Sequence, residues 1–157
     1  MRNFCITKLF FGNNMKKEKE SVYMENIIKE LNQFLADLNV FYRKLQNYHW
    51  YIEGRDFFIV HSKLEEYYDE VNKSIDEVAE FILIKNGEPL GTIKDYLEIT
   101  KIKEAENKKV NSELVFNELI NDFSYLLKNV KAIKKQAEKE DDDLASNFMD
   151  EFIADYS

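Results

Sequence analysis

The chain has few residues that interrupt helices, with one proline and four glycines among 157 residues. Proline breaks a helix interior and glycine weakens it, so this scarcity favours long, uninterrupted helices. Cysteine is also scarce. Because Cys5 is the only one, the chain cannot form an internal disulfide, which fits a reducing compartment, and we expect a cytoplasmic protein. No apolar run approaches the roughly 20 residues that span a bilayer, so we expect no membrane partner.

The charge of the chain is unbalanced, with a formal net charge of -8 at pH 7. Such a surface repels phosphate backbones and attracts cations, so we expect DNA binding to be absent at physiological salt. The composition is otherwise ordinary for a globular protein, at 45% hydrophobic and 33% charged residues. The length is sufficient for one domain with a sizeable core.

Residues 1–23 lack a clear helical period, and we interpret them as a disordered or loosely docked extension. They contain no unbroken apolar stretch of the roughly 7–15 residues that a signal peptide needs. The lysines between residues 16 and 19 alternate with glutamates, so an unbroken basic tail is absent. We consider Met15 and Met24 as candidate starts of the natural chain. Residues 24–157 form the predicted folded domain.

Apolar residues in the domain recur at steps of three and four, the period of amphipathic helices. The pattern predicts helices over residues 25–51, 56–86 and 104–139, and a fourth that follows the acidic run 141–143. We expect further residues beyond Ser157, where the pattern is still helical. The link over residues 88–102 holds a short helix near Thr92 and, when extended, reaches about 50 Å. It can therefore cross a bundle of thirty-residue helices, each about 45 Å long. We predict an all-α, four-helix bundle with this long crossover.

The stretch from His49 to Glu80 contains both histidines of the chain and its only tryptophan. On the second predicted helix, an arc of roughly 100° holds four candidate metal ligands. They are His61, Glu65, Asp76 and Glu80. Mixed imidazole and carboxylate ligands suit iron, manganese or zinc. The simpler alternatives are structural histidines and solvated surface carboxylates.

The spacing of these residues excludes one site within one helix. His61 and Asp76 lie roughly 22 Å apart along a helix, whereas a metal–ligand bond is about 2 Å long. Two copies of the helix, antiparallel about a two-fold axis near Val71, would bring the pairs together in two equivalent sites. This interpretation requires an unbroken helix between Leu64 and Ser74. The sequence therefore predicts a metal centre shared between the subunits of a homodimer.

A longer motif extends this pattern. The segment H-W-x-x-x-G-x-x-F-x-x-x-H-x-x-x-E, followed by D-E-x-A-E, resembles the Dps family, the ferritin-like miniferritins. In this chain the motif comprises His49, Trp50, Gly54, Phe57, His61, Glu65, Asp76, Glu77, Ala79 and Glu80. The resemblance implies a ferritin-like four-helix bundle with a short helix in the crossover, assembled from two-fold dimers into a hollow dodecamer.

The resemblance also implies ferroxidase centres at the two-fold interfaces. One subunit would supply His49, His61 and Glu65, and its partner Asp76 and Glu80. Trp50 matches an aromatic residue beside the centre, and two roles stay open for it: a catalytic one, in which it supplies or absorbs an electron when only one iron is bound, and hydrophobic packing at the interface. The implied activity is oxidation of Fe(II), usually with hydrogen peroxide and otherwise with oxygen, and storage of ferric mineral, which protects against oxidative damage.

The chain departs from the family pattern at two positions. Glu65 stands where aspartate is common, so its carboxylate reaches one methylene further, and Phe81 replaces a usual arginine.

Three rival interpretations differ in class. Conventional ferritins use Glu-x-x-His pairs, but neither histidine here has a glutamate three residues before it. A DNA-compacting protein with a secondary or vestigial iron role is the second rival, opposed by the acidic balance. A purely structural helical oligomer is the third.

Overall fold

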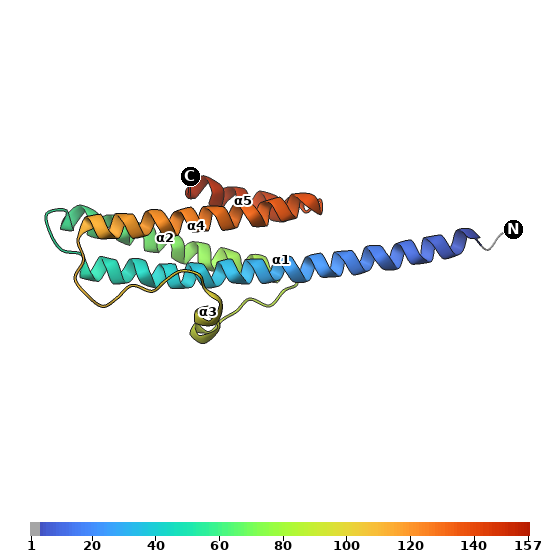
Figure 1. Ribbon diagram of the computed structural model, residues 1–157, viewed down its shortest axis with the longest axis horizontal. Coiled ribbons are helices and arrows are strands. Elements are labelled where there is room, and N and C mark those ends of the chain that lie inside the picture. The colour runs from blue at the N-terminus through green and yellow to red at the C-terminus, as the bar shows by residue number, and fades with distance from the viewer. Residues whose placement is uncertain (1–3) are drawn as a thin grey trace.

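The computed structural model describes the backbone of residues 4–157 and the side chains of residues 15–157. Figure 1 shows long helices lying side by side, with a small helix on the connection that crosses them. In chain order the elements are α1 (Phe4–Tyr51), α2 (Phe57–Ile84), α3 (Ile93–Ile99), α4 (Ser112–Lys139) and α5 (Asp143–Asp155). The predicted all-α bundle with a short helix in the crossover is confirmed. None of the described helices is both long and apolar enough to cross a membrane.

The core lies between the four longer helices, each of which contributes fully buried side chains. Burying one such side chain stabilises the fold by about 1.5–3 kcal/mol relative to leaving it exposed. The largest are Ile27, Leu31, Phe34, Leu35, Leu38, Phe41 and Leu45 from α1, Leu64 and Ile82 from α2, Leu126 and Ile133 from α4, and Phe152 from α5. The predicted apolar faces therefore meet in one core.

The start of α1 differs from the predicted start at residue 25, because the helix begins at Phe4. No proline or glycine lies between residues 15 and 24, and Lys16 pairs with Glu20 one turn later at 3.9 Å. The side chains of residues 15–22 are exposed, so this stretch shows no apolar period. It projects beyond the other helices (Figure 1). Residues 1–3 lie outside the described residues, and the division at residue 23 stays a prediction.

The start of α4 also differs, at Ser112 instead of residue 104. Val110 forms an extended contact with the start of the α1–α2 turn. Its amide donates to the Tyr51 carbonyl at 3.1 Å and its carbonyl accepts from the Glu53 amide at 2.9 Å. Asn111 then caps α4 by accepting from the Leu114 amide at 2.9 Å. Tertiary pairing thus takes the residues before Asn111 out of the predicted helix.

The crossover between α2 and α4 is hydrogen-bonded to a buried carboxylate of α1. Asp37, which is 0% exposed, accepts hydrogen bonds from Thr100 Oγ1 at 2.8 Å, the Lys101 amide at 2.7 Å and Tyr125 Oη at 2.7 Å. Before this point, Thr92 caps α3 by accepting from the Asp95 amide. The connection therefore follows a defined path along the bundle.

Candidate metal centre

The turn between α1 and α2 brings the two histidines together. His49 lies in the last turn of α1 and is 8% exposed, whereas His61 lies near the start of α2 and is half-buried. Their imidazole centroids are 3.6 Å apart and the ring planes differ by 21°. Gly54 shapes the turn with φ of 111°, a backbone conformation that side chains disfavour.

Each histidine is held by the backbone of the other. His49 Nδ1 lies 2.8 Å from the carbonyl oxygen of residue 61, and His61 Nδ1 lies 2.9 Å from the carbonyl oxygen of residue 49. Because a carbonyl only accepts hydrogen bonds, both Nδ1 atoms must carry the hydrogen. In the neutral rings, both Nε2 atoms therefore keep a lone pair, the state that binds metal.

The three candidate carboxylates are all exposed and lie along α2. Glu65 follows His61 by one turn, and Asp76 and Glu80 lie further along the same helix. Because α2 is unbroken from Phe57 to Ile84, the condition for the shared site is met. In the part of the chain that the structure describes, no group of three or more His, Cys, Asp or Glu side chains is placed to hold a metal ion. One copy thus brings the two histidines together but does not assemble three of the candidate ligands at one point.

Two large apolar side chains share the exposed side of α2 with these ligands. Phe58 is 83% exposed near the start of the helix, and Leu83 is 58% exposed near its end. At about 100° per residue, both fall within the arc that holds the four candidate ligands. This side of α2 therefore combines metal-binding groups with an apolar residue at each end.

Trp50 points away from the core and is 61% exposed. It borders a hollow of about 450 Å³ together with Arg43, Asn47 and the segment 104–107. Its predicted catalytic role stays a prediction.

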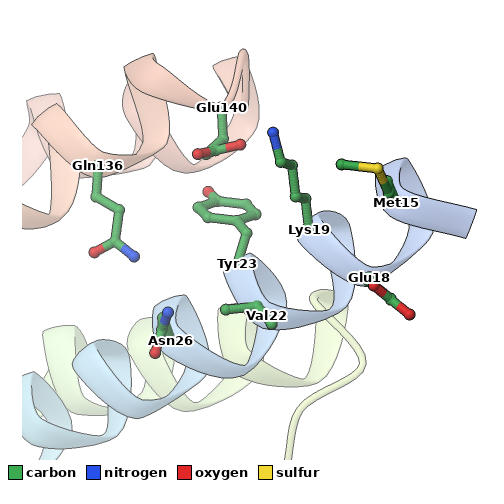
Figure 2. A pocket seen from close by; sticks show the side chains of 8 residues that line it. All are labelled: Met15, Glu18, Lys19, Val22, Tyr23, Asn26, Gln136 and Glu140. Carbon is green, nitrogen blue, oxygen red and sulfur yellow. The ribbon is translucent and has the colours of Figure 1, made fainter. Parts of the chain in front are cut away.

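A hollow of about 530 Å³ lies elsewhere, where the projecting part of α1 passes the end of α4. Figure 2 shows Met15, Lys19 and Tyr23 of α1 facing Gln136 and Glu140. Tyr23 is separated from His49 by about 39 Å along α1. This hollow contains no histidine and lies apart from the candidate metal centre.

In the sequence, Phe57 belongs to the family motif and Tyr68 to the apolar period of the second helix, and neither was predicted to contact a histidine. The structure places both rings against the histidines, Phe57 beside His61 and Tyr68 beside His49. The one signal in the sequence was the spacing of Phe57, which precedes His61 by one helical turn.

Comparisons with known proteins agree with this architecture. The Ferritin family model, a ferritin-like domain, matches residues 28–157. The DNA protection during starvation protein 2 of Bacillus anthracis is 38% identical, with 80% of this chain and 85% of the relative aligned. The crystal structure of Dps from Staphylococcus aureus superimposes with a TM-score of 0.80 at 36% identity, covering 84% of this chain and 88% of that one.

A Dps protein from Vibrio cholerae, described as a member of a broad superfamily of ferritin-like diiron-carboxylate proteins, gives a TM-score of 0.82 at 32% identity, covering 86% of this chain and 84% of that one. The helical bundle, the crossover helix and these relatives lead to one assignment: the chain belongs to the Dps family of ferritin-like proteins.

Proposed function

We propose that the chain is a ferroxidase that oxidises Fe(II), with hydrogen peroxide as its preferred oxidant, and stores the ferric product as mineral in the cytoplasm. Membership of the Dps family supports an iron-related protective role. Imidazole nitrogen and carboxylate oxygen are donors that suit iron. The proposed ligands are His49, His61, Glu65, Asp76 and Glu80.

The observation that carries the proposal is a symmetry in the positions along α2. Three pairs of side chains on its exposed side share one midpoint, between residues 70 and 71, so an antiparallel second copy would place the members of each pair opposite each other. The pairs are His61 with Glu80, Glu65 with Asp76, and Phe58 with Leu83. The Val71 side chain is buried against its own chain. The two-fold axis would therefore pass the helix near residue 71 on the opposite, exposed side of α2.

The chemistry follows from these donors. Anionic oxygen ligands favour Fe(III) over Fe(II), so they promote loss of an electron. Two neighbouring Fe(II) ions supply the two electrons that reduce one hydrogen peroxide, with two protons, to two waters, and no hydroxyl radical is released. Where only one iron is bound, Trp50 next to His49 supplies the second electron. The exposed acidic side of α2 attracts the cationic substrate.

The family resemblance further supports assembly of two-fold dimers into a closed dodecamer, which would enclose the mineral. Size-exclusion chromatography with light scattering should find twelve chains per particle. A stable monomer at micromolar concentration would remove the shared site.

Iron-uptake kinetics test the activity directly. Fe(II) is added to wild type and to His61→Ala, with hydrogen peroxide or with oxygen, and Fe(III) absorbance is followed. Wild type should oxidise Fe(II) rapidly and faster with peroxide, whereas His61→Ala should fall to the rate in buffer. Equal rates for the two proteins would refute the ferroxidase proposal.

A DNA-compacting role is the second candidate, and one observation favours it. Four lysines lie on the exposed side of the second half of α4, and no carboxylate pairs with them among the described residues. They are Lys128, Lys131, Lys135 and Lys139. We name this set the α4 lysine ridge. The net charge of -8 opposes this role, so we propose it only as a weak, salt-sensitive contact.

A further inference from the structure

The two histidines stand in a row of four aromatic rings. The ring of Phe57 lies 4.9 Å from that of His61, at an interplanar angle of 26°. His61 in turn stacks on His49 at 3.6 Å, and Tyr68 meets His49 edge-on at 5.3 Å and 89°. The rings of Phe57 and His49 both lie nearly parallel to the His61 ring. Among the described residues, Phe57 and His49 form no close ring pair with each other. The two rings therefore cover opposite faces of the His61 imidazole.

Both helices of the hairpin hold this row. Phe57 is the first residue of α2, and its amide donates to the Gly54 carbonyl at 3.3 Å. Tyr68 lies two turns after His61 and is met edge-on by Tyr42 of α1 at 6.0 Å. The Tyr42 hydroxyl accepts a hydrogen bond from Gln46 Nε2 at 2.9 Å. The outer rings are therefore anchored independently of the histidines.

A single hydrogen bond does not fix an imidazole. The Nδ1–H···O contact sets the position of one atom, but the ring can still tilt about that bond. The metal-binding Nε2 lies across the ring and moves with the tilt. A binding site tolerates errors of only about 0.5 Å and roughly 10–20°. Something besides the two carbonyls must set the ring planes.

We propose that Phe57 and Tyr68 are positioning residues for the metal centre. Phe57 closes the outer face of His61, and Tyr68 stops the tilt of His49, so both Nε2 atoms are aimed before metal arrives. This inference rests on the proposed function, because metal binding is the reason for aligning the rings. The alignment itself, a fixed tautomer and orientation of both imidazoles, exists in the metal-free protein.

The exposure of the two outer residues separates this role from ordinary core packing. Phe57 and Tyr68 are only half-buried, whereas core rings such as Phe34 and Phe41 are 0% exposed. A half-buried ring contributes less to stability than a fully buried one. Phe116 of α4 offers a control, because it is a phenylalanine that is 47% exposed and forms no ring pair with His61, His49 or Phe57 among the described residues.

The first test uses the metal-free protein. With ¹⁵N-histidine labelling, the two histidines give four ring-nitrogen signals in magic-angle-spinning NMR of the assembled protein. Wild type should show protonated Nδ1 and unprotonated Nε2 in both rings. Phe57→Leu keeps an apolar side chain but removes the flat face, so the His61 signals should move toward tautomer-averaged values. Phe57→Tyr and Phe116→Leu should retain the wild-type spectrum.

The second test uses Co(II) alone, followed by its visible absorption. Loss of an outer-shell partner typically weakens metal binding about 10–100-fold. We expect a Kd about tenfold higher for Phe57→Leu and an unchanged Kd for the two other variants. Phe57→Leu that matches wild type in both tests would overturn the inference. Absence of Co(II) binding by wild type would instead count against the proposed function, while the spectrum of the metal-free protein would still decide the inference.

Tyr68 provides a second variant if Phe57→Leu loses helix content or assembly. Tyr68→Leu should disturb the His49 signals and weaken Co(II) binding, and Tyr68→Phe should restore both. Normal His49 signals and Co(II) affinity in Tyr68→Leu would refute the positioning role.

Discussion

Lys44 of α1 and Asp122 of α4 form an ion pair inside the bundle, with Lys44 Nζ 2.7 Å from Asp122 Oδ2. Only 1% of the Lys44 side chain and 11% of the Asp122 side chain are exposed. Glu118 lies 3.0 Å from the same Nζ. Burial lowers the pKa of Lys44, but the hydrogen bonds and charges of Asp122 and Glu118 outweigh it and hold that pKa above its usual value.

Lys44→Met should therefore destabilise the fold strongly. It leaves Asp122 buried without its cation, and breaking a buried pair in this way costs about 3–5 kcal/mol. Urea unfolding at fixed protein concentration measures the loss. Lys109→Met is the control, since it removes an exposed pair with Glu53, whose contribution is about 0–1 kcal/mol. Similar losses for both variants would show that the buried pair has no special weight.

The Asp142 carboxylate predicts a pH-dependent stability. Burial raises its pKa, but Lys85, the Ala145 amide and the Tyr23 hydroxyl together outweigh this and hold the pKa below its usual value. A depressed pKa means that the stabilisation is present above the unfolded-state pKa and is lost as pH falls through the folded-state value. Asp142→Asn keeps the helix cap but removes the charge. Its unfolding free energy should lie about 1.5–3 kcal/mol below wild type at pH 7. The difference between the two proteins should shrink as the pH falls below the usual aspartate pKa of about 3.9, and a constant difference would contradict this account.

The hydrogen bond from the Tyr125 hydroxyl to the buried Asp37 carboxylate should contribute strongly to the stability of the fold. Hydrogen bonds to charged groups contribute about 1.5–3 kcal/mol, against roughly 0.5–1.5 kcal/mol for neutral pairs. Tyr125→Phe should therefore cost more unfolding free energy than Tyr96→Phe, which removes a 2.8 Å bond to the Leu90 carbonyl. Thermal and urea unfolding of both variants provide the comparison. Equal costs would indicate that Asp37 is satisfied without Tyr125.

The shared metal site predicts rescue between inactive variants. Asp76→Ala or Glu80→Ala, and separately His61→Ala, should abolish fast peroxide-driven iron oxidation. In a dimer of one carboxylate variant and one His61→Ala chain, both missing ligands belong to the same site. The second site then keeps all of its ligands. Dissociating, mixing and reassembling the proteins should thus restore up to half of the site activity in each heterodimer. If mass spectrometry demonstrates heterodimers and no activity returns, each site belongs to one chain.

DNA binding should be absent under physiological conditions. The net charge of -8 predicts no retardation of plasmid DNA at neutral pH and physiological salt. At low salt, any shift should come from the α4 lysine ridge and disappear in Lys131→Gln/Lys135→Gln. The matched control is Lys16→Gln/Lys17→Gln, which changes the same charge on projecting α1. Retardation that persists at physiological salt would reveal a stronger contact than the net charge allows.

Helical periodicity predicted every element that buries an apolar stripe, and α2 follows its predicted range closely. Periodicity did not predict the exposed first part of α1, which has no apolar face to bury. It also misplaced the start of α4, because Val110 pairs with Ile52, a residue distant in sequence. The spacing of His61 and Asp76 predicted a shared site, which stays a prediction. The contacts of Lys44 with Asp122 and of Phe57 with His61 were not predicted, because periodicity identifies the face of a side chain but not its partner.

The exchange of hydrogen bonds between His49 and His61 has an evolutionary consequence. Both acceptors are main-chain carbonyls, and no amino-acid substitution can delete a carbonyl. Neighbouring side chains can therefore vary over generations without removing either acceptor. The vulnerable point is the path of the main chain between the helices. Gly54, with its φ of 111°, lies on that path, so a mutation in this turn would move one carbonyl away from its ring.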